Sequence, residues 1–441
     1  MSESAAKTGF VGLSHLGIVS AIGWASFGRP VVAIDPDPES VASLAHGDLP
    51  VREPGLPELL ARTAGHLSFS TDLGQLAGCP LVIISRDVPT DTANHSDLSP
   101  VLALVDAAVP HLKSGVVLVV MSQVPPGFTR ALGERIRAAR PDLEFQLFYW
   151  VETLIFGEAV QRTLHPERFI VGCAEPALPL PAVFQAGLEA YGCPILPMAY
   201  ASAELTKTAI NLYLAASVTY ANTLSDLCEA IGADWSEIVP ALRLDKRIGP
   251  AAYLRPSLGV AGGNLERDLI TLQNLCRSHE VDSTYLDALV EYNNQRFQWV
   301  TRHLRDRVFG QVVEPTIGIW GLTYKRNTRS TKNSPGLRLI DELNGRAIMR
   351  AWDPAIEAGD VSTAAEIVSA PEDVLPDADC LVIMADWEDF GRADMHPVRD
   401  VMRRPLVIDC PGVLQLRRAE LRDMRIDYVG MGHQACVEQR S

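Results

Sequence analysis

The chain has 441 residues, of which 47% are hydrophobic, and a formal net charge of -15. This length favours two or three domains with buried cores, and the excess of acidic residues argues against a nucleic-acid partner. The longest apolar runs, such as residues 115–121, are much shorter than the ~20 residues of a membrane span. Because the N-terminus also lacks a secretory signal, we expect a cytoplasmic protein with no membrane partner.

The first segment has the order strand, glycine turn, helix, strand, which opens a doubly wound parallel sheet. Apolar runs that are typical of strands then recur, separated by segments long enough for helices. The expected elements are strands at 8–11, 31–35, 81–84, 115–121 and 168–172, with a helix at 18–27.

The middle of the chain changes character, because residues 202–231 and 281–308 favour helices. After residue 315 the strand pattern returns and repeats short pieces of the first segment in the same order. The pairs are 319–322 (IWGL) with 10–13 (FVGL), 351–354 (AWDP) with 33–36 (AIDP), 380–383 (CLVI) with 80–83 (PLVI), and 407–412 (VIDCPG) with the strand and Pro-Pro-Gly turn that ends at 127.

We therefore predict an α/β protein with two Rossmann-like doubly wound domains joined by a helical central domain. The expected boundaries are 1–199 for the first domain, 200–300 for the helical domain and 301–441 for the last. The eight cysteines are scattered, without the spacing of a zinc site, so no metal is expected and the thiols are interpreted as reduced and mostly buried.

The turn Gly12-x-Ser14-x-x-Gly17 lies between a strand and a helix, and Asp35 ends the next strand. In a dinucleotide-binding turn the glycines let the pyrophosphate and the helix approach the backbone closely, while the acid accepts hydrogen bonds from ribose hydroxyls. An acid at this position favours NAD over NADP. Ser14 replaces the middle glycine and crowds that approach. The alternative is an ordinary turn with a solvated aspartate.

Several segments together resemble the UDP-glucose/GDP-mannose 6-dehydrogenase family, and the resemblance covers nearly the whole chain. They are 51–60 (VREPGLPELL), 164–172 (LHPERFIVG), 203–211 (AELTKTAIN), 227–233 (LCEAIGA), 247–250 (RIGP), 321–325 (GLTYK) and the Ser-Pro pair at 334–335. The resemblance implies that the first domain binds NAD, that the last binds the nucleotide of a nucleotide sugar, and that the long middle helix builds a homodimer.

The resemblance also assigns residues to the two ligands. At the NAD site it places Gly12, Ser14, Leu16, Gly17, Asp35, Pro89, Gln123 and Lys332. At the substrate site it places Arg247, Tyr253, Leu254, Gly259, Gly262, Phe156 and Lys325.

The loop 259–268 (GVAGGNLERD) resembles the family's "GFGGSCFxKD", whose cysteine traps the aldehyde formed by a first oxidation. A thioester formed on that cysteine permits a second oxidation to the acid. Asn264 stands in the cysteine's place, and a carboxamide is not a nucleophile at neutral pH. The next cysteine, Cys276, lies about three helical turns or ~18 Å further along a helix.

Other departures gather on the parts that handle acyl transfer and sugar recognition. In the segment similar to "NPEFLREG" the first glutamate remains as Glu152, whereas the second is Phe156. Gln123 replaces a threonine, Arg267 replaces the lysine of the cysteine loop, and 409–411 (DCP) lacks the arginine of the family's "DGR".

The residues for one hydride transfer are retained. Lys207 and Asn211 are four residues apart on a helix, so they share a face, and Asp268 can accept a proton while Lys207 stabilises the alkoxide. Structural alternatives are a solvated Lys207 paired with Glu204, and Asp268 as an acid favoured by the helix dipole. Asn264 acts as a helix N-cap, alone or with a hydrogen bond to the substrate.

We therefore expect an NAD-dependent nucleotide-sugar dehydrogenase that removes two electrons and yields an aldehyde or a ketone. The alternatives are a four-electron oxidation to a uronate without a thioester, an NAD-dependent epimerase, and a non-catalytic paralogue that binds nucleotides. The identity of the nucleotide and of the sugar stays open at this point.

Overall fold

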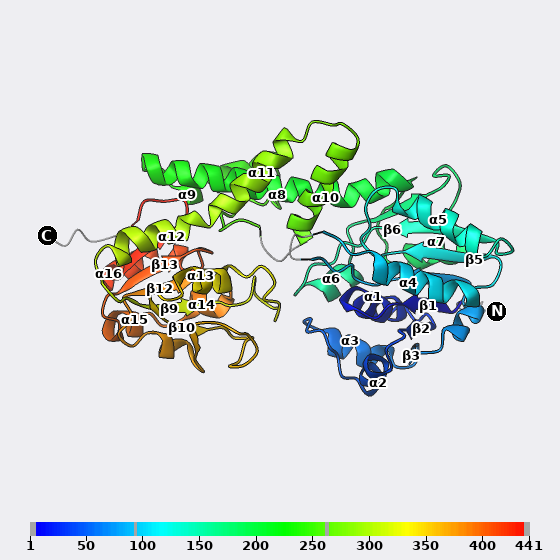
Figure 1. The fold of residues 1–441 in the computed structure, drawn as a ribbon, viewed down its shortest axis with the longest axis horizontal. Helices are drawn as coiled ribbons and strands as arrows, with labels where there is room; N and C mark the ends of the chain where they lie inside the picture. The colour runs from blue at the N-terminus through cyan, green and yellow to red at the C-terminus, as the bar shows by residue number, and fades with distance from the viewer. Residues whose placement is uncertain (1–5, 92–94, 261–263, 436–441) are drawn as a thin grey trace. The chain divides into compact units, whose positions relative to one another are not determined.

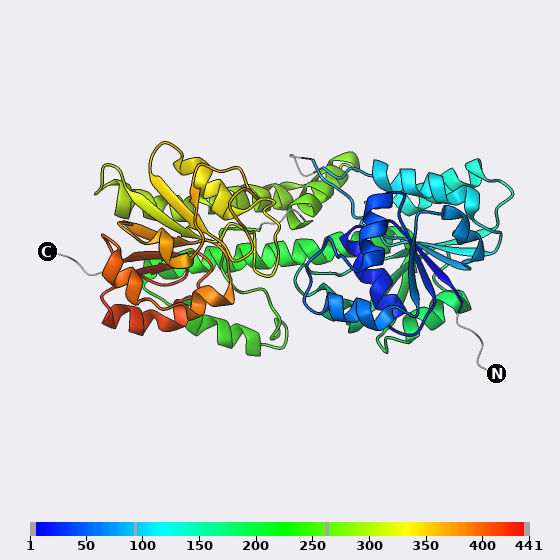
Figure 2. The same cartoon turned by 90° about the horizontal axis from the view of Figure 1, so that it is seen from below.

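The computed structural model describes residues 6–91, 95–260 and 264–435, and of Asn264 only the backbone. The chain divides into two compact units, Met1–Ile210 and Asn211–Ser441. The division falls inside the long helix α8 (Tyr200–Ile231). Both units contain a sheet with helices on its two faces, as Figures 1 and 2 show, which confirms the predicted α/β fold with a helical central region.

The described part of unit 1 contains an 8-stranded sheet in the order β3-β2-β1-β4-β5-β6-β7-β8. Neighbouring strands are parallel except β6 and β7, which pair antiparallel. The strands are β1 (Thr8–Val11), β2 (Val31–Ile34), β3 (Leu67–Ser70), β4 (Leu81–Ile84), β5 (Val116–Val120), β6 (Phe145–Trp150), β7 (Phe169–Cys173) and β8 (Ile195–Ala199). Among them β3, β6 and β8 lay outside the sequence prediction.

Alternate residues of these strands point to opposite faces of the sheet, so each face has its own core. Phe10 belongs to the core beneath α1, α3, α6 and α7, whereas Val11 belongs to the core beneath α4 and α5. The helices of this unit are α1 (His15–Ala25), α2 (Pro38–His46), α3 (Leu56–Thr63), α4 (Ser99–Ala108), α5 (Phe128–Ala139), α6 (Ala159–Leu164) and α7 (Ala182–Glu189).

Unit 2 contains a parallel sheet in the order β11-β10-β9-β12-β13-β14. Its strands are β9 (Thr316–Trp320), β10 (Ile348–Trp352), β11 (Glu366–Ile367), β12 (Cys380–Ile383), β13 (Leu406–Asp409) and β14 (Asp427–Gly430). Its helices after α8 are α9 (Trp235–Leu244), α10 (Asn264–Ser278), α11 (Thr284–Arg296), α12 (Gln298–Leu304), α13 (Pro335–Leu343), α14 (Glu388–Arg392), α15 (His396–Val401) and α16 (Arg418–Asp423).

The two sheets share one detail, which explains the glycine in the first pair of repeated pieces (10–13 and 319–322). A Cβ atom built on Gly17 would lie 1.8 Å from the carbonyl oxygen of Gly12, and one built on Gly336 would lie 2.1 Å from that of Gly321. A side chain fits at neither position, because real Cβ atoms do not approach other atoms this closely. Each unit therefore starts its sheet with the same tight packing of a helix against a strand end.

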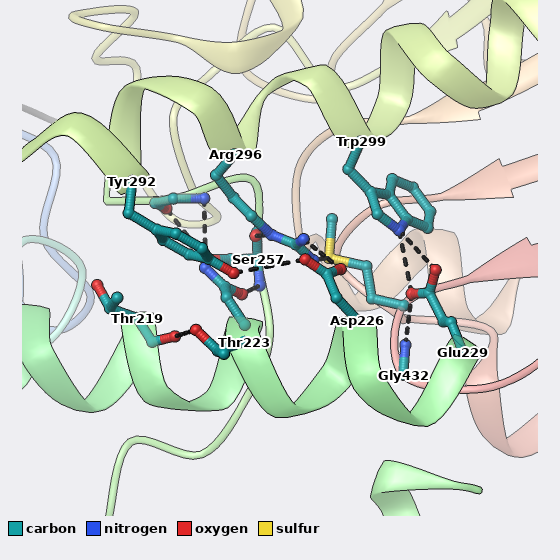
Figure 3. A network of polar contacts seen from close by, with 12 residues as sticks. Thr219, Thr223, Asp226, Glu229, Ser257, Tyr292, Arg296, Trp299 and Gly432 are labelled. Carbon is teal, nitrogen blue, oxygen red and sulfur yellow. Dashed lines mark hydrogen bonds and ion pairs between the residues drawn. The ribbon is translucent and has the colours of Figure 1, made fainter. Parts of the chain in front are cut away.

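A buried polar network holds helices of unit 2 together (Figure 3). Arg296 on α11 is 4% exposed; it pairs with Asp226 of α8 at 2.5 Å and donates to the Ser257 carbonyl oxygen at 2.9 Å. On the next turn of α8, Glu229 accepts hydrogen bonds from the Trp299 indole at 3.0 Å and the Gly432 N–H at 3.0 Å. These contacts join α8 to α11, α12 and the segment after β14.

Burial raises the pKa of the Glu229 carboxyl group, and the Gly432 N–H and the Trp299 indole oppose that shift. A raised pKa means that the folded state favours the protonated acid. The contribution of Glu229 to stability is therefore largest below its unfolded pKa and falls as the pH rises through the folded pKa.

Replacing Asp226 with alanine tests the network, because it leaves the buried guanidinium of Arg296 without its carboxylate. We expect a loss of about 2 kcal/mol in the free energy of unfolding, measured by urea denaturation. The control is Asp306→Ala, which removes the carboxylate that forms an exposed ion pair with Arg305. Such a pair contributes little, so equal losses in the two variants would contradict this interpretation.

Candidate functional site

The turn between β1 and α1 collects most of the residues expected at the NAD site. The buried carboxylate of Asp35 accepts hydrogen bonds from the Leu13 N–H at 2.7 Å and from the Asp37 N–H at 3.0 Å. Ser14 immediately precedes α1, and Leu16 and Gly17 lie in its first turn. The contact between Gly17 and Gly12 leaves no room for a side chain, so the helix N-terminus lies close to the end of the strand.

Two charged residues that contact this turn from another loop were not expected from the sequence. Arg86 and Asp87 follow β4, the strand beside β1. Asp87 accepts a hydrogen bond from the Leu16 N–H at 3.0 Å, and its own N–H donates to Ser14 Oγ at 2.7 Å. Arg86 lies 3.4 Å from Asp35. The sequence did contain a signal for them, because two charged residues closely follow a buried strand. Parallel strands end at the same edge of a sheet, so residues after β4 lie near residues after β1.

The geometry of this turn fits a dinucleotide. The N-terminus of α1 offers backbone N–H donors for phosphate, and Asp35 ends the strand where a ribose is bound in such folds. Pro89 follows β4, which lies beside β1, and Gln123 follows β5, the next strand beyond β4 in this sheet. Lys332 belongs to unit 2, in the loop before α13.

Lys207 and Glu152 form a nearly buried ion pair within unit 1. Lys207 Nζ lies 2.7 Å from Glu152 Oε1 and donates to the Glu152 carbonyl oxygen at 3.1 Å. The other carboxylate oxygen of Glu152 accepts from the Leu154 N–H at 2.9 Å. These contacts fix both side chains at the end of β6, where a charged amine is available for an anionic oxygen.

The expected alternative for Lys207, a solvated pair with Glu204, is wrong. Glu204 is fully buried and accepts hydrogen bonds from the N–H groups of Gly127 at 2.6 Å and Thr129 at 2.7 Å. It therefore caps the start of α5, where a carboxylate is favoured by the helix dipole. Because sequence spacing cannot show this long-range contact, the sequence suggested the wrong partner.

Phe156 contacts a second cluster that the sequence analysis did not assign. Its ring lies 4.3 Å from that of His15, centroid to centroid. Glu53 accepts from His15 at 2.8 Å and from the N–H groups of Gly157 at 2.9 Å and Ala159 at 3.1 Å. Burial alone would raise the pKa of Glu53, but these hydrogen bonds lower it. Glu53 thus holds the segment after β6 against the start of α1.

Asp268 is a buried carboxylate in unit 2, and its side-chain partners include Asn211 and Arg267. Its oxygens lie 2.5 Å from Asn211 Nδ2 and 3.3 Å from Arg267 Nε. All three side chains are less than 10% exposed. Asp268 is the fifth residue of α10, and these specific contacts account for its position better than the helix dipole does.

The substrate loop is described in part. Asn264 is the first residue of α10, but its side chain, and with it the expected capping, lies outside the described part, as does Gly262. Gly259 has φ 104°, and a Cβ atom there would lie 2.5 Å from Asn293 Oδ1. The same oxygen accepts the Val260 N–H at 2.7 Å. Gly259 therefore allows this loop to pack against α11.

Unit 2 contains an open cavity of about 670 Å³. Residues that follow β9, β12 and β13 line it, so it lies at the carboxyl ends of the strands, beside the position where the strand order reverses between β9 and β12. Such crevices bind ligands in open α/β sheets. Its lining includes Leu254, Trp387 and the arginines 243, 255, 326 and 392.

Arg255 is one of the lining residues. Its guanidinium donates two hydrogen bonds to the Pro411 carbonyl oxygen, at 2.9 and 2.5 Å, and lies 3.4 Å from Asp386. Leu254 and Lys325 were expected from the sequence, whereas the neighbouring Arg255 and Arg326 were not. The sequence offered a signal for both arginines, because each directly follows a residue that was expected to contact the substrate.

Three other expected substrate residues are placed elsewhere. The side chain of Arg247 is 88% exposed and pairs with Asp245 at 2.7 Å. Tyr253 is 45% exposed, and Lys325 Nζ lies 5.6 Å from the centroid of the Tyr324 ring. None of these three is among the described residues that line the cavity.

Three domain models of one family match the chain in order. They are the NAD binding domain at residues 6–183, the central domain at 201–295 and the UDP binding domain at 318–416 of the UDP-glucose/GDP-mannose dehydrogenase family. The chain belongs to this family. It is accordingly an NAD-dependent oxidoreductase that acts on a CH–OH group of a nucleotide sugar.

Curated relatives match over almost their full length. UDP-glucose 6-dehydrogenase of Rhizobium meliloti is 27% identical, with 97% of this chain and 99% of the relative covered. UDP-glucose 6-dehydrogenase of Pseudomonas aeruginosa is 29% identical, with 96% of both covered. The structure of a UDP-glucose dehydrogenase from Pyrobaculum islandicum is similar with a TM-score of 0.84 and 28% identity, over 95% of this chain and 97% of that one.

Within residues 6–91, 95–260 and 264–435, no helix combines the length and apolar character that a membrane crossing requires. The same described residues contain no group of three or more potential metal ligands.

Arg255→Gln tests whether the cavity binds the nucleotide of the substrate. We expect the Kd for UDP or GDP, whichever binds the unchanged protein, to rise about tenfold, because a charge-assisted hydrogen bond to phosphate is lost. Titration calorimetry measures the change, and a thermal melt checks the fold. Arg277→Gln is the control, since Arg277 is an exposed arginine of α10 in the same unit. An unchanged Kd in Arg255→Gln would contradict binding of the nucleotide in this cavity.

Proposed function

We propose that this family member oxidises a hydroxyl group of a nucleotide sugar by two electrons only and releases an aldehyde or a ketone. The observation that carries the proposal is the contrast within α10. Asp268 is retained and held by Asn211 and Arg267, whereas Asn264, the first residue of the same helix, stands where the resemblance places a nucleophilic cysteine. The groups for one hydride transfer are present, and a group for acyl transfer is missing at that position.

Each retained residue has a separate task in the proposed reaction. NAD supplies the hydride acceptor when it is bound. Asp268 accepts the proton of the hydroxyl group, directly or through a water molecule, as the C–H bond breaks and the hydride departs. Lys207 stabilises the negative charge that develops on the oxygen, and Glu152 orients the Lys207 ammonium. Asn211 holds the carboxylate of Asp268 in place by its hydrogen bond.

The described cysteines offer no substitute for the missing nucleophile. A thiol attacks as its thiolate, and burial in apolar surroundings disfavours the thiolate. Burial raises the pKa of six of the described thiols, those of Cys79, Cys173, Cys193, Cys228, Cys380 and Cys410. Cys276 lies twelve residues beyond Asn264 on α10, about 18 Å along the helix. The described cysteines are all free, which supports the expected cytoplasmic location.

The nucleotide is proposed to bind in the cavity of unit 2. Its arginines can neutralise a diphosphate, and the partly buried Trp387 offers a flat apolar surface for a base. Two of these arginines, Arg243 and Arg255, belong to the expected helical domain (200–300), and Arg326 and Arg392 belong to the expected nucleotide-sugar domain (301–441). The division of the chain into these two domains and a cofactor domain (1–199) stays a proposal.

The number of NADH molecules per molecule of product decides the reaction. We expect one NADH and an aldehyde or ketone when the protein is incubated with a panel of UDP- and GDP-sugars. The measurement combines absorbance of NADH with mass spectrometry of the product. Two NADH and a uronate would refute the two-electron reaction and indicate oxidation through the aldehyde hydrate. An epimerised sugar without net NADH would also refute it.

Asn264→Cys and Asn264→Ser form a matched pair for the same experiment. If the product is an aldehyde, the cysteine variant supplies the missing nucleophile, and we expect a covalent substrate adduct in its intact mass or a second NADH. The serine variant, of similar size but weaker nucleophilicity, should stay at one NADH.

We also propose a homodimer through the central helix. Tyr213, Tyr220 and Leu227 are spaced seven residues apart on α8, and with Ile231 they form an exposed apolar row. A seven-residue spacing keeps side chains on one helix face, and such a row is typical of a surface that packs against a second helix. A second copy of α8 is the occupant that the resemblance implies.

Leu227→Glu tests the dimer, because it places a charge within this apolar row. We expect the mass measured by light scattering to fall from that of two chains to that of one at micromolar concentration. Gln298→Glu, which adds a charge at an exposed position of α12, is the control and should leave the mass unchanged. A monomeric unchanged protein, or a dimeric Leu227→Glu variant, would contradict the proposal.

A further inference from the structure

The N-terminus of α1 has an acidic occupant from its own chain. The Leu16 N–H is one of the donors that the first turn of a helix leaves without an intrahelical partner. It donates to Asp87 Oδ2 at 3.0 Å. A helix N-terminus favours an anion, and in a dinucleotide fold this is the place of the pyrophosphate. The carboxylate of Asp87 therefore accepts from a backbone donor that a pyrophosphate bound at this helix N-terminus would use.

The residue before Asp87 contacts the second part of the same turn. Arg86 lies 3.4 Å from Asp35, the acid expected to bind the ribose. The two adjacent residues thus place a negative charge at the phosphate position and a positive charge at the ribose position. The Asp87 carboxylate has the negative charge of a phosphate group, and the Arg86 guanidinium donates a hydrogen bond to Asp35 as a ribose hydroxyl would.

Ser14 connects this loop to the turn. Its hydroxyl oxygen accepts the Asp87 N–H at 2.7 Å, a contact that a glycine at position 14 could not make. The departure of Ser14 from the glycine pattern thus has a structural partner, because the serine holds the backbone of the acidic residue beside the helix.

The loop is anchored on both sides of the two charged residues. Ser85 is fully buried and donates to the Gly12 carbonyl oxygen at 3.1 Å, and Val88 is 7% exposed. Asp87 itself is exposed. The side chain of Asp87 can therefore rotate into solvent while the loop stays in place.

We propose that Arg86 and Asp87 are an internal substitute for the dinucleotide, which NAD displaces when it binds, and that Asp87 thereby lowers the affinity for NAD. Two anions cannot share the N–H group of Leu16, and the repulsion between a carboxylate and a pyrophosphate a few ångströms apart remains appreciable near a protein surface. Asp87 is in this view a residue that determines cofactor affinity, and it takes no part in the chemical step.

Asp87→Asn is the direct test, because the amide keeps the size and the acceptor oxygen of the side chain but loses its charge. We expect the Kd for NAD, measured by calorimetry on the full chain without substrate, to fall roughly three- to tenfold at low ionic strength. The gain should shrink at high salt, where charge repulsion is screened. Asp48→Asn is the matched control, since it removes one exposed carboxylate from the same unit.

An unchanged or higher Kd in Asp87→Asn would overturn the proposal, and so would an equal gain in Asp48→Asn. The result is independent of the proposed two-electron reaction, because it measures binding of NAD alone.

Ser14→Gly provides a second variant that releases the loop without a change of charge. If Ser14 acts by holding Asp87, Ser14→Gly as a single substitution lowers the Kd for NAD. The same substitution then has a smaller effect when Asp87→Asn is already present. Additive gains in the double variant would contradict this link between the two residues.

Discussion

Both sheets depend on one constraint. It is the close contact between the glycine that follows a strand and a glycine inside the next helix. In unit 1 it joins Gly12 to Gly17, and in unit 2 it joins Gly321 to Gly336. Because no side chain fits there, the helix N-terminus approaches the strand end closely. That approach brings backbone donors to the edge of the sheet, where the residues after the parallel strands also meet.

Several buried charges of the two units have specific partners. Lys207 is paired with Glu152, Asp268 with Arg267 and Asn211, and Asp35 with backbone N–H groups and Arg86. A buried charge without such partners would carry a large desolvation penalty. The same pairing that makes burial tolerable also fixes the orientation of each group, and fixed orientation is what proton transfer and alkoxide stabilisation require.

The sequence was sufficient for the fold class because apolar periodicity and glycine turns are local signals. The strands at Thr8–Val11 and Cys380–Ile383 and the helix to Ile231 were all predictable in this way. Strand β6 was missed, although Glu152 follows it two residues after its end. Among the candidate site residues, Lys207, Asn211 and Asp268 came from motif resemblance, whereas the cavity arginines did not, since no motif marks which loops converge.

By itself the sequence determined that the protein has two nucleotide-binding α/β sheets, that it resembles a dehydrogenase family, and that an asparagine stands at the nucleophile's position. These conclusions depend on residue type and spacing along the chain. Only the tertiary structure decided that Glu204 caps α5 instead of pairing with Lys207, and that Asp87 lies at the N-terminus of α1. Those contacts join residues more than 70 positions apart, and the distance between such residues is set by sheet packing, which spacing along the chain does not encode.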